Sequence, residues 1–264
     1  MRHITPEAFM HGRFDIHPRP QWKAAVLCFR DLEGSRQLVE ELGALPLGYK
    51  VITGMEEFPG NPLAYAHELT IGEAKVGVIA RCEWGGPQTA FVVEELAHIG
   101  VTQIIGIGAC GSIDPDIPKG SQVVAPTALL TDGTSKAYSS DETEITGDPL
   151  LCSLALSAGQ SLSTKVTSVR TVTTDAIYRE TEADVRTWRE WGGQVVNMET
   201  SALYAASETC GIKCLWIGHV SDCLVGGDWE AWSDIEDMTV TSARIGLEIL
   251  ARMYSHTGRE DGAA

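Results

Sequence analysis

The chain alternates short apolar runs with longer segments whose apolar positions recur every three or four residues. Runs of the first kind predict buried strands, and segments of the second kind predict helices. We expect strands at 24–28, 48–54, 67–71, 74–81, 102–108, 122–125, 165–172 and 213–220, and helices at 35–42, 87–98, 149–159, 181–191, 201–209 and 239–254. This alternation predicts an α/β fold with a largely parallel or mixed sheet between helical layers.

Three segments stand outside this pattern. Residues 1–22 are rich in His, Pro and Arg and are expected to form an extended arm before a single domain at 23–254. The polar residues 255–264 are expected to form a disordered tail. Residues 131–148 are also polar and predict a long loop, a kind of segment that often carries function in compact domains.

Composition narrows the possible partners. The 264 residues are 44% hydrophobic and 21% charged, which suits one large α/β domain. The net charge of −16 argues against nucleic acid or an anionic membrane as a partner, because either would require a basic patch. No apolar run reaches the roughly 20 residues of a membrane helix. The N-terminus lacks the apolar stretch of a signal peptide, and the seven scattered cysteines show no metal-ligand spacing, so we expect a cytoplasmic protein without a metal site.

Two carboxylates follow apolar runs and are the first candidates for chemistry. Residues 195–199 (VVNME) pass into an Ala-rich helix, which places Glu199 at a helix start beside a strand end. Residues 216–220 form another apolar run, which ends in Ser221-Asp222. Ligands of open α/β sheets bind at such strand ends, where a carboxylate can accept hydrogen bonds from both hydroxyls of a ribose. Taken alone, each acidic residue is explained equally well as a helix cap.

A third candidate is the segment 102–112 (TQIIGIGACGS), in which a strand is expected to run into a Gly-rich turn. Glycines let the backbone approach a ligand and expose its N–H groups, although such a turn is also common without a ligand. The order of the motifs is distinctive: a Gly-rich strand end, then Asn-Met-Glu, then Val-Ser-Asp. Four further motifs accompany them, namely WGGP at 84–87, KGSQVV at 119–124, TDGTS at 131–135 and TTDAIY at 173–178.

As a set, these motifs resemble the nucleoside phosphorylase and nucleosidase superfamily, which includes purine nucleoside phosphorylase, uridine phosphorylase and methylthioadenosine nucleosidase. The resemblance covers about residues 24–253. It implies a three-layer α/β sandwich with a central mixed, mostly parallel sheet, and cleavage of the N-glycosidic bond of a purine-like nucleoside without a metal or organic cofactor. It also implies a homo-oligomer, a dimer or hexamer, for which tryptophans 188, 191, 229 and 232 offer contacts.

The resemblance also assigns roles to individual residues. Glu199 would bind the ribose hydroxyls, Met198 would pack on the sugar, and Asp222 would donate a proton to the imidazole ring of the departing purine. The remaining expected substrate contacts are Asn197, Ser221, Gly86, Trp84, Ala109, Cys110, Gly111, Ile177 and Tyr178. Trp84 is explained better as a core residue, and core packing is also an explanation for Ile177.

The nucleophile side departs from the phosphorylase pattern. Phosphorylases hold phosphate with an Arg and a Ser or Thr hydroxyl of the Gly-rich segment, and the matching positions here are Gly106 and Ala109. A second phosphate Arg falls on Glu33 when the first strand is matched without gaps. Nucleosidases of the superfamily, which use water, carry a Glu in this region. Glu33 is therefore expected to position or deprotonate water, and hydrolysis is favoured over phosphorolysis.

Two alternatives stay open. A shift of three residues brings Arg36 to the phosphate position, with Arg30 as a further candidate. The protein would then be a purine or uridine nucleoside phosphorylase with inorganic phosphate as a co-substrate. The second alternative is a non-catalytic nucleoside-binding or storage protein with the same fold. The presence of both Glu199 and Asp222 argues against it, because a mere scaffold needs neither.

Overall fold

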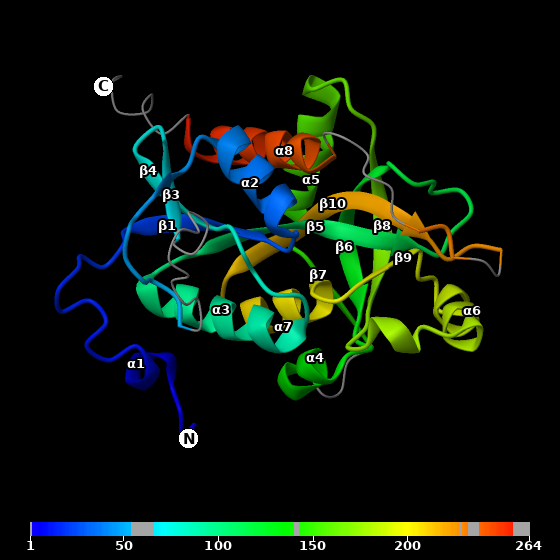
Figure 1. The fold of residues 1–264 in the computed structure, drawn as a ribbon, viewed down its shortest axis with the longest axis horizontal. Helices are drawn as coiled ribbons and strands as arrows, with labels where there is room; N and C mark the ends of the chain where they lie inside the picture. The colour runs from blue at the N-terminus through cyan, green and yellow to red at the C-terminus, as the bar shows by residue number, and fades with distance from the viewer. Residues whose placement is uncertain (1, 54–65, 140–142, 227–228, 232–237, 256–264) are drawn as a thin grey trace, which may run out of the picture.

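The computed structural model describes residues 2–53, 66–139, 143–226, 229–231 and 238–255. These residues form a ten-stranded mixed sheet with helices on both faces (Figure 1), which confirms the expected α/β sandwich. The strands are β1 (Trp22–Cys28), β2 (Leu45–Pro46), β3 (His67–Ile71), β4 (Ala74–Ile79), β5 (Gln103–Ser112), β6 (Gln122–Leu129), β7 (Glu144–Thr146), β8 (Val166–Thr173), β9 (Val195–Asn197) and β10 (Lys213–Cys223). The helices are α1 (Pro6–Phe9), α2 (Leu32–Leu42), α3 (Gly86–Ile99), α4 (Gly133–Tyr138), α5 (Pro149–Ser161), the 3-10 turn η2 (Ile177–Arg179), α6 (Glu182–Glu190), α7 (Thr200–Thr209) and α8 (Met238–Tyr254).

The strand order brings several strand ends together. The order is β10-β6-β8-β9-β5-β1-β4-β3-β2, and β10 also pairs with β5, so five of the strands close into a ring. β1 and β10 both run parallel to β5, which places their carboxyl ends side by side. β9 runs antiparallel to β5 and pairs with Gly111 and Ser112 at the carboxyl end of that strand. The residues that follow Asn197 therefore lie at the same end of the sheet. Ligands of such sheets bind at this end.

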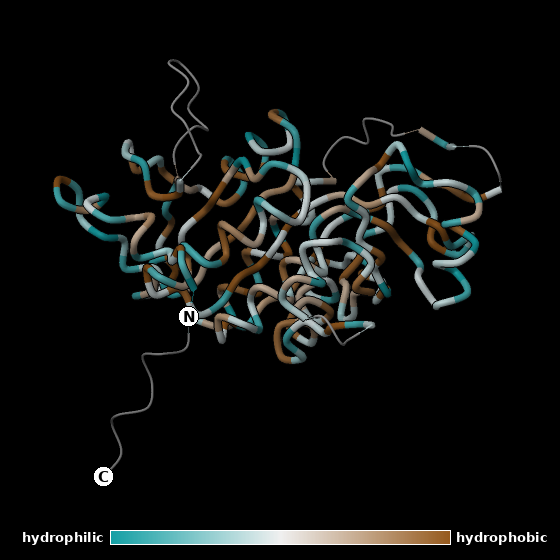
Figure 2. The backbone as a smooth tube through the Cα atoms, turned by 90° about the horizontal axis from the view of Figure 1, so that it is seen from below, coloured by the Kyte–Doolittle hydropathy of each residue, from teal (hydrophilic) through white to brown (hydrophobic). Residues whose placement is uncertain are grey.

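Both faces of the sheet are covered, which explains why its central strands are apolar along their whole length. Helices α2, α5 and α8 lie on one face, with Leu38, Leu151 and Ile249 in the core beneath them. Helices α3 and α7 lie on the other face and bury Leu96 and Leu203. Hydrophobic segments cross the middle of the molecule, and hydrophilic ones are frequent on the outlying loops (Figure 2).

Three expectations about local structure were wrong. Residues 48–53 form a turn with Gly48 at φ 73°, a left-handed conformation that ends any strand there. The expected loop 131–148 contains the short helix α4, capped by the Asp132 side chain, and the strand β7. Both elements are too short to show a clear periodicity in the sequence. The Gly-rich segment is not a turn either, because β5 continues as a strand through Ser112.

The N-terminal segment is folded back on the domain instead of extended. It contains the single-turn helix α1, and the Phe9 ring packs edge to face on Phe91 of α3 with ring centres 5.6 Å apart. Met10 is buried, and Arg13 forms an ion pair with Glu95 at 3.6 Å. The expected disordered tail at 255–264 lies outside the described residues, apart from Ser255.

Candidate active site

A cavity of about 440 Å³ lies at the carboxyl ends of β1, β5, β9 and β10, within the size range of small-molecule sites. The first turn of α2 and the turn η2 complete its wall. The lining residues are Phe29, Arg30, Asp31, Glu33, Gly34, Gln37, Trp84, Ala109, Cys110, Gly111, Ile177, Glu180, Val196, Asn197, Met198, Glu199, His219, Val220, Ser221, Asp222, Leu224, Met238 and Thr239.

Glu199 is held in the cavity by its neighbours along the chain. Asn197 fixes the turn that leads into α7, because its Oδ1 accepts from the backbone N–H groups of Glu199 and Thr200 at 3.3 Å. One Glu199 carboxylate oxygen accepts from the backbone N–H of Gly85 at 3.2 Å, and the other from that of Met198 at 3.3 Å. The carboxyl is almost fully buried, and burial raises its pKa to about 7. The side chain is therefore fixed in place with spare acceptor capacity.

Asp222 enters the cavity from an irregularity in β10. The pairing register with β5 shifts between Val220 and Asp222, as in a β-bulge, which re-aims the side chains that follow it. The carboxylate accepts from the Ser221 hydroxyl at 2.6 Å and from the Trp229 indole N–H at 2.9 Å. Gly111 makes room for it, because a Cβ there would lie 3.3 Å from the Asp222 carboxylate oxygen. A directed carboxyl group thus lies at one side of the cavity.

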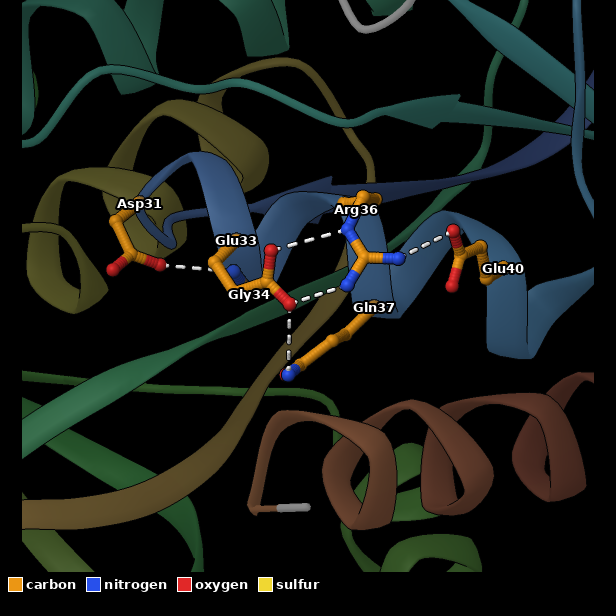
Figure 3. Close-up of polar contacts among 6 residues, drawn as sticks. All are labelled: Asp31, Glu33, Gly34, Arg36, Gln37 and Glu40. Carbon is orange, nitrogen blue, oxygen red and sulfur yellow. Dashed lines mark hydrogen bonds and ion pairs between the residues drawn. The ribbon is translucent and has the colours of Figure 1, made fainter. Parts of the chain in front are cut away.

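Glu33 lines the cavity, but its carboxylate is engaged elsewhere (Figure 3). It forms an ion pair with Arg36 one turn later on α2, and Gln37 donates to it at 3.4 Å. The Arg36 hydrogen bond holds the pKa of Glu33 below its usual value, which makes the carboxylate a weak base. Arg36 also pairs with Glu40 at 2.7 Å and is not among the cavity-lining residues.

Arg30 lies where the α2 helix begins. A Cβ on Gly34 would come within 2.9 Å of the Arg30 Nε, so the glycine allows the arginine to fold over the first turn of α2. The Nε is buried without a hydrogen-bond partner, and no residue of the described chain forms an ion pair with this guanidinium. A free guanidinium beside a helix N-terminus is suited to binding an anion.

His219 faces the same cavity from β10. Its side chain is only 4% exposed, and its Nδ1 has no hydrogen-bond partner within the described part of the chain. Burial, assisted by the charge of Arg30, lowers the pKa of His219 to about 3, so the imidazole is neutral. A neutral imidazole still has one N–H to donate. Arg30 and His219 therefore both line the cavity, and each has a side-chain nitrogen without a hydrogen-bond partner among the described residues.

The other predicted site residues divide into two groups. Asn197, Met198, Ser221, Ala109, Cys110, Gly111, Ile177 and Trp84 line the cavity, and the Trp84 indole N–H donates to the Phe29 carbonyl at 3.2 Å. Gly86 does not line it, because this residue packs against Thr134 and Ala202. Tyr178 does not line it either and is 99% exposed.

His219 and Glu180 are among the cavity residues that the sequence reasoning missed. His219 interrupts an apolar strand two residues before Ser221, and a polar residue in such a strand is a usable signal. Glu180 lies between η2 and α6, and nothing in the local sequence distinguishes it from surface glutamates. Its pKa is raised to about 7 by burial and by the nearby charge of Asp222.

Comparison with known proteins identifies the family. A family model described as the phosphorylase superfamily matches residues 41–253, which is well over half of the chain. The chain belongs to the phosphorylase superfamily. The matched region includes every cavity-lining segment except the first turn of α2 and the end of β1. The expected family resemblance is therefore confirmed.

Three relatives illustrate the range of this superfamily. The chain is 40% identical over 151 residues to an uncharacterised protein, R802, of Acanthamoeba polyphaga mimivirus, a match covering 57% of this chain and 58% of the viral protein. It is 28% identical over 169 residues to the guanosine phosphorylase of Halorubrum lacusprofundi, covering 64% of this chain and 70% of that protein. It is 29% identical over 167 residues to the DeoD-type purine nucleoside phosphorylase of Caldanaerobacter subterraneus subsp. tengcongensis, covering 62% and 72%.

The described residues were also compared with the requirements for a metal site, a membrane helix and a subunit contact. Within the described ranges, no group of three or more His, Cys, Asp or Glu side chains is arranged to hold a metal ion. No helix in the same ranges is long and apolar enough to cross a bilayer. Trp191 and Trp229 are exposed, Trp188 is partly buried, and Trp232 lies outside the described residues. The homo-oligomer and the cytoplasmic location stay predictions.

Proposed function

We propose that the protein is a nucleoside phosphorylase acting on purine nucleosides. Phosphate attacks C1′ of the ribose, the bond from C1′ to N9 of the base breaks, and the products are the free purine and ribose 1-phosphate. The observation that carries the proposal is one cavity with three kinds of group: the buried carboxyl of Glu199, the directed carboxyl of Asp222 and the unpaired side-chain nitrogens of Arg30 and His219.

Each group has a distinct task in this reaction. Glu199 accepts hydrogen bonds from the ribose hydroxyls as the sugar gains positive charge, an interaction that strengthens in the transition state. Asp222 in its protonated form gives a proton to N7 of the purine, so that the base departs neutral and the aspartate carboxylate is left behind. Arg30 and His219 hold the phosphate beside the N-terminus of α2. No metal or organic cofactor is needed for these steps.

Phosphorolysis is a better account than the hydrolysis expected from the sequence. Two relatives with a named activity, from Halorubrum and Caldanaerobacter, are called phosphorylases. Glu33, the expected base for water, is neutralised by Arg36 on its own helix. Arg30, in contrast, has an unpaired guanidinium nitrogen in the cavity wall.

Hydrolysis by the same site is the second candidate, and one observation favours it. A Cβ on Gly106 would meet Leu203 at 2.9 Å and Trp216 at 3.2 Å, so apolar side chains fill the space around the position of a phosphorylase arginine. Ala109 likewise offers no hydroxyl to an anion. Phosphorolysis requires that Arg30 and His219 take the place of the missing arginine and hydroxyl in binding phosphate. Hydrolysis does not require this.

The Arg30→Gln variant tests this compensation. We expect its KM for phosphate to rise about 10- to 100-fold, because a hydrogen bond to a charged group contributes about 1.5–3 kcal/mol. The KM for the nucleoside should change little, since Arg30 is assigned to phosphate alone. Steady-state kinetics with each substrate varied in turn measures both constants.

Arg36→Gln is the matched control, because Arg36 lies six residues later, on α2, and pairs with Glu33 and Glu40. Its phosphate KM should stay within about twofold of the wild-type value, as for most surface substitutions. A large effect in the Arg36 variant with none in the Arg30 variant would reverse the assignment of the phosphate ligand.

A further inference from the structure

Trp229 is an exposed tryptophan whose indole N–H reaches a carboxyl group of the candidate active site. Its side chain is 55% exposed, yet the N–H donates to the Asp222 carboxylate at 2.9 Å. Trp229 lines a groove along α6 that shares Glu180 and Leu224 with the cavity, and it is not among the residues that line the cavity itself. The indole therefore approaches Asp222 from outside the cavity, and it has no task in the proposed mechanism.

The backbone that follows Trp229 is fixed to two neighbouring elements. Glu230 forms an antiparallel bridge with Cys223 at the end of β10, in which its N–H donates at 2.8 Å and its carbonyl accepts at 3.1 Å. Lys119, the first residue of the KGSQVV motif, donates to the Ala231 carbonyl at 2.6 Å and pairs with the Glu230 carboxylate at 3.0 Å. These contacts hold the indole in place, as a group that positions another side chain requires.

The two donors to Asp222 differ in what they can do. The indole N–H of Trp229, which contacts Oδ2, can only donate. The Ser221 hydroxyl, which contacts Oδ1 at 2.6 Å, can both donate and accept, and it lies 3.3 Å from a second acceptor, the Cys110 carbonyl. The carbonyl oxygen of a protonated carboxyl is its better acceptor. The indole therefore favours Oδ2 as the accepting oxygen and Oδ1 as the oxygen that carries the proton.

We propose that Trp229 is a positioning residue for the proton donor. Its indole N–H keeps Oδ2 of Asp222 as an acceptor and leaves the proton on Oδ1, beside Ser221, which lines the cavity. This inference rests on the proposed function, in which Asp222 protonates the departing purine. The proton moves from Oδ1 to N7 as the bond from C1′ to N9 breaks. The carboxylate left behind accepts from both Trp229 and Ser221, which is the arrangement in the structure.

A substrate that needs no proton separates this role from a merely structural one. Trp229→Phe keeps an aromatic ring and removes the N–H donor. We expect kcat for inosine to fall about tenfold, the effect of losing one hydrogen bond to a charged group. For a nitrophenyl riboside, whose leaving group departs without protonation, kcat should stay within about twofold of the wild-type value. Equal losses on the two substrates would overturn the proposal, because a distorted site slows both reactions.

Trp191→Phe is the matched control, because Trp191 is 54% exposed and lines neither the cavity nor the groove. Both of its rates should match those of the wild type. In an Asp222→Asn background, Trp229→Phe should cause no further loss on inosine, since the two residues act through one proton. A second loss of about tenfold in that background would also overturn the proposal, because Trp229 would then act independently of Asp222.

NMR of the indole N–H groups tests the contact without turnover. The resonance that disappears in Trp229→Phe should shift, and exchange faster with solvent, in Asp222→Ala, which removes the acceptor. An unchanged resonance would refute the placement of Asp222 by Trp229. A resonance that responds, in a wild-type protein that cleaves neither inosine nor the riboside, would support this placement and reject only the proposed reaction.

Discussion

Replacing Glu199 with glutamine should lower kcat for purine nucleosides about 100- to 1,000-fold, the effect of removing one preorganised electrostatic contact. The carboxylate accepts from two backbone N–H groups and is buried, so its charge faces the ribose without competition from water. A neutral amide keeps the shape but not the charge that the developing oxocarbenium ion requires. Steady-state kinetics checks this, with Glu208→Gln on the exposed side of α7 as the control.

The same substitution should lower activity but reduce the loss of stability at high pH. Burial raises the pKa of Glu199 from 4.5 to about 7, so the folded state favours the protonated carboxyl. The contribution of Glu199 to the free energy of unfolding is fully present below pH 4.5, the pKa of this carboxyl in the unfolded chain. It is lost as the pH rises through about 7. Glutamine cannot ionise, so Glu199→Gln should lose less stability than the wild type between pH 5 and pH 8. A Tm well below that of the wild type at pH 8 would mean that the carboxylate is structural.

Replacing Asp222 with asparagine should lower turnover of purine nucleosides about 100- to 10,000-fold, the usual contribution of a general acid. The amide can still accept from Ser221 or Trp229, so the geometry of the bulge should persist. A nitrophenyl riboside has a leaving group that departs without protonation, and its cleavage should be nearly unaffected. The two substrates compared on one variant give the measurement.

This comparison contains its own control for folding, because a misfolded site would lose both activities. Equal losses on the purine nucleoside and the nitrophenyl riboside would therefore show that Asp222 supports the structure of β10 and does not supply the proton.

Strands of the sheet could be predicted from the sequence where their residues are uniformly buried. They could not be predicted where small residues pack closely against a neighbouring strand. The apolar runs of β1, β5 and β10 identify strands covered on both faces. The glycines of β5 suggest a turn, yet Trp216 of β10 packs against Gly106 and Gly108, and a Cβ on either would lie 3.2 Å from its ring. These glycines serve a tertiary contact, which the sequence alone does not reveal.

Much of the cavity lining was predictable, including its two central carboxylates. Glu199 and Asp222 follow strands, so their meeting at one end of the sheet follows from the topology. Glu33 was expected to activate water, and this role stays a prediction; its carboxylate pairs with Arg36 on its own helix, where residues three apart are neighbours. Arg30 and His219 come from different strand ends, and only the pairing of β1 and β10 with β5 brings them to one cavity.

Product analysis with and without phosphate tests the central claim most directly. Purine nucleosides incubated with the enzyme and inorganic phosphate should yield free purine and ribose 1-phosphate in equal amounts, and turnover should stop when phosphate is removed. Glu33→Gln should retain most of its activity, because its carboxylate is bound to Arg36. Release of free ribose at full rate in phosphate-free buffer, abolished in Glu33→Gln, would contradict phosphorolysis and assign the reaction to water.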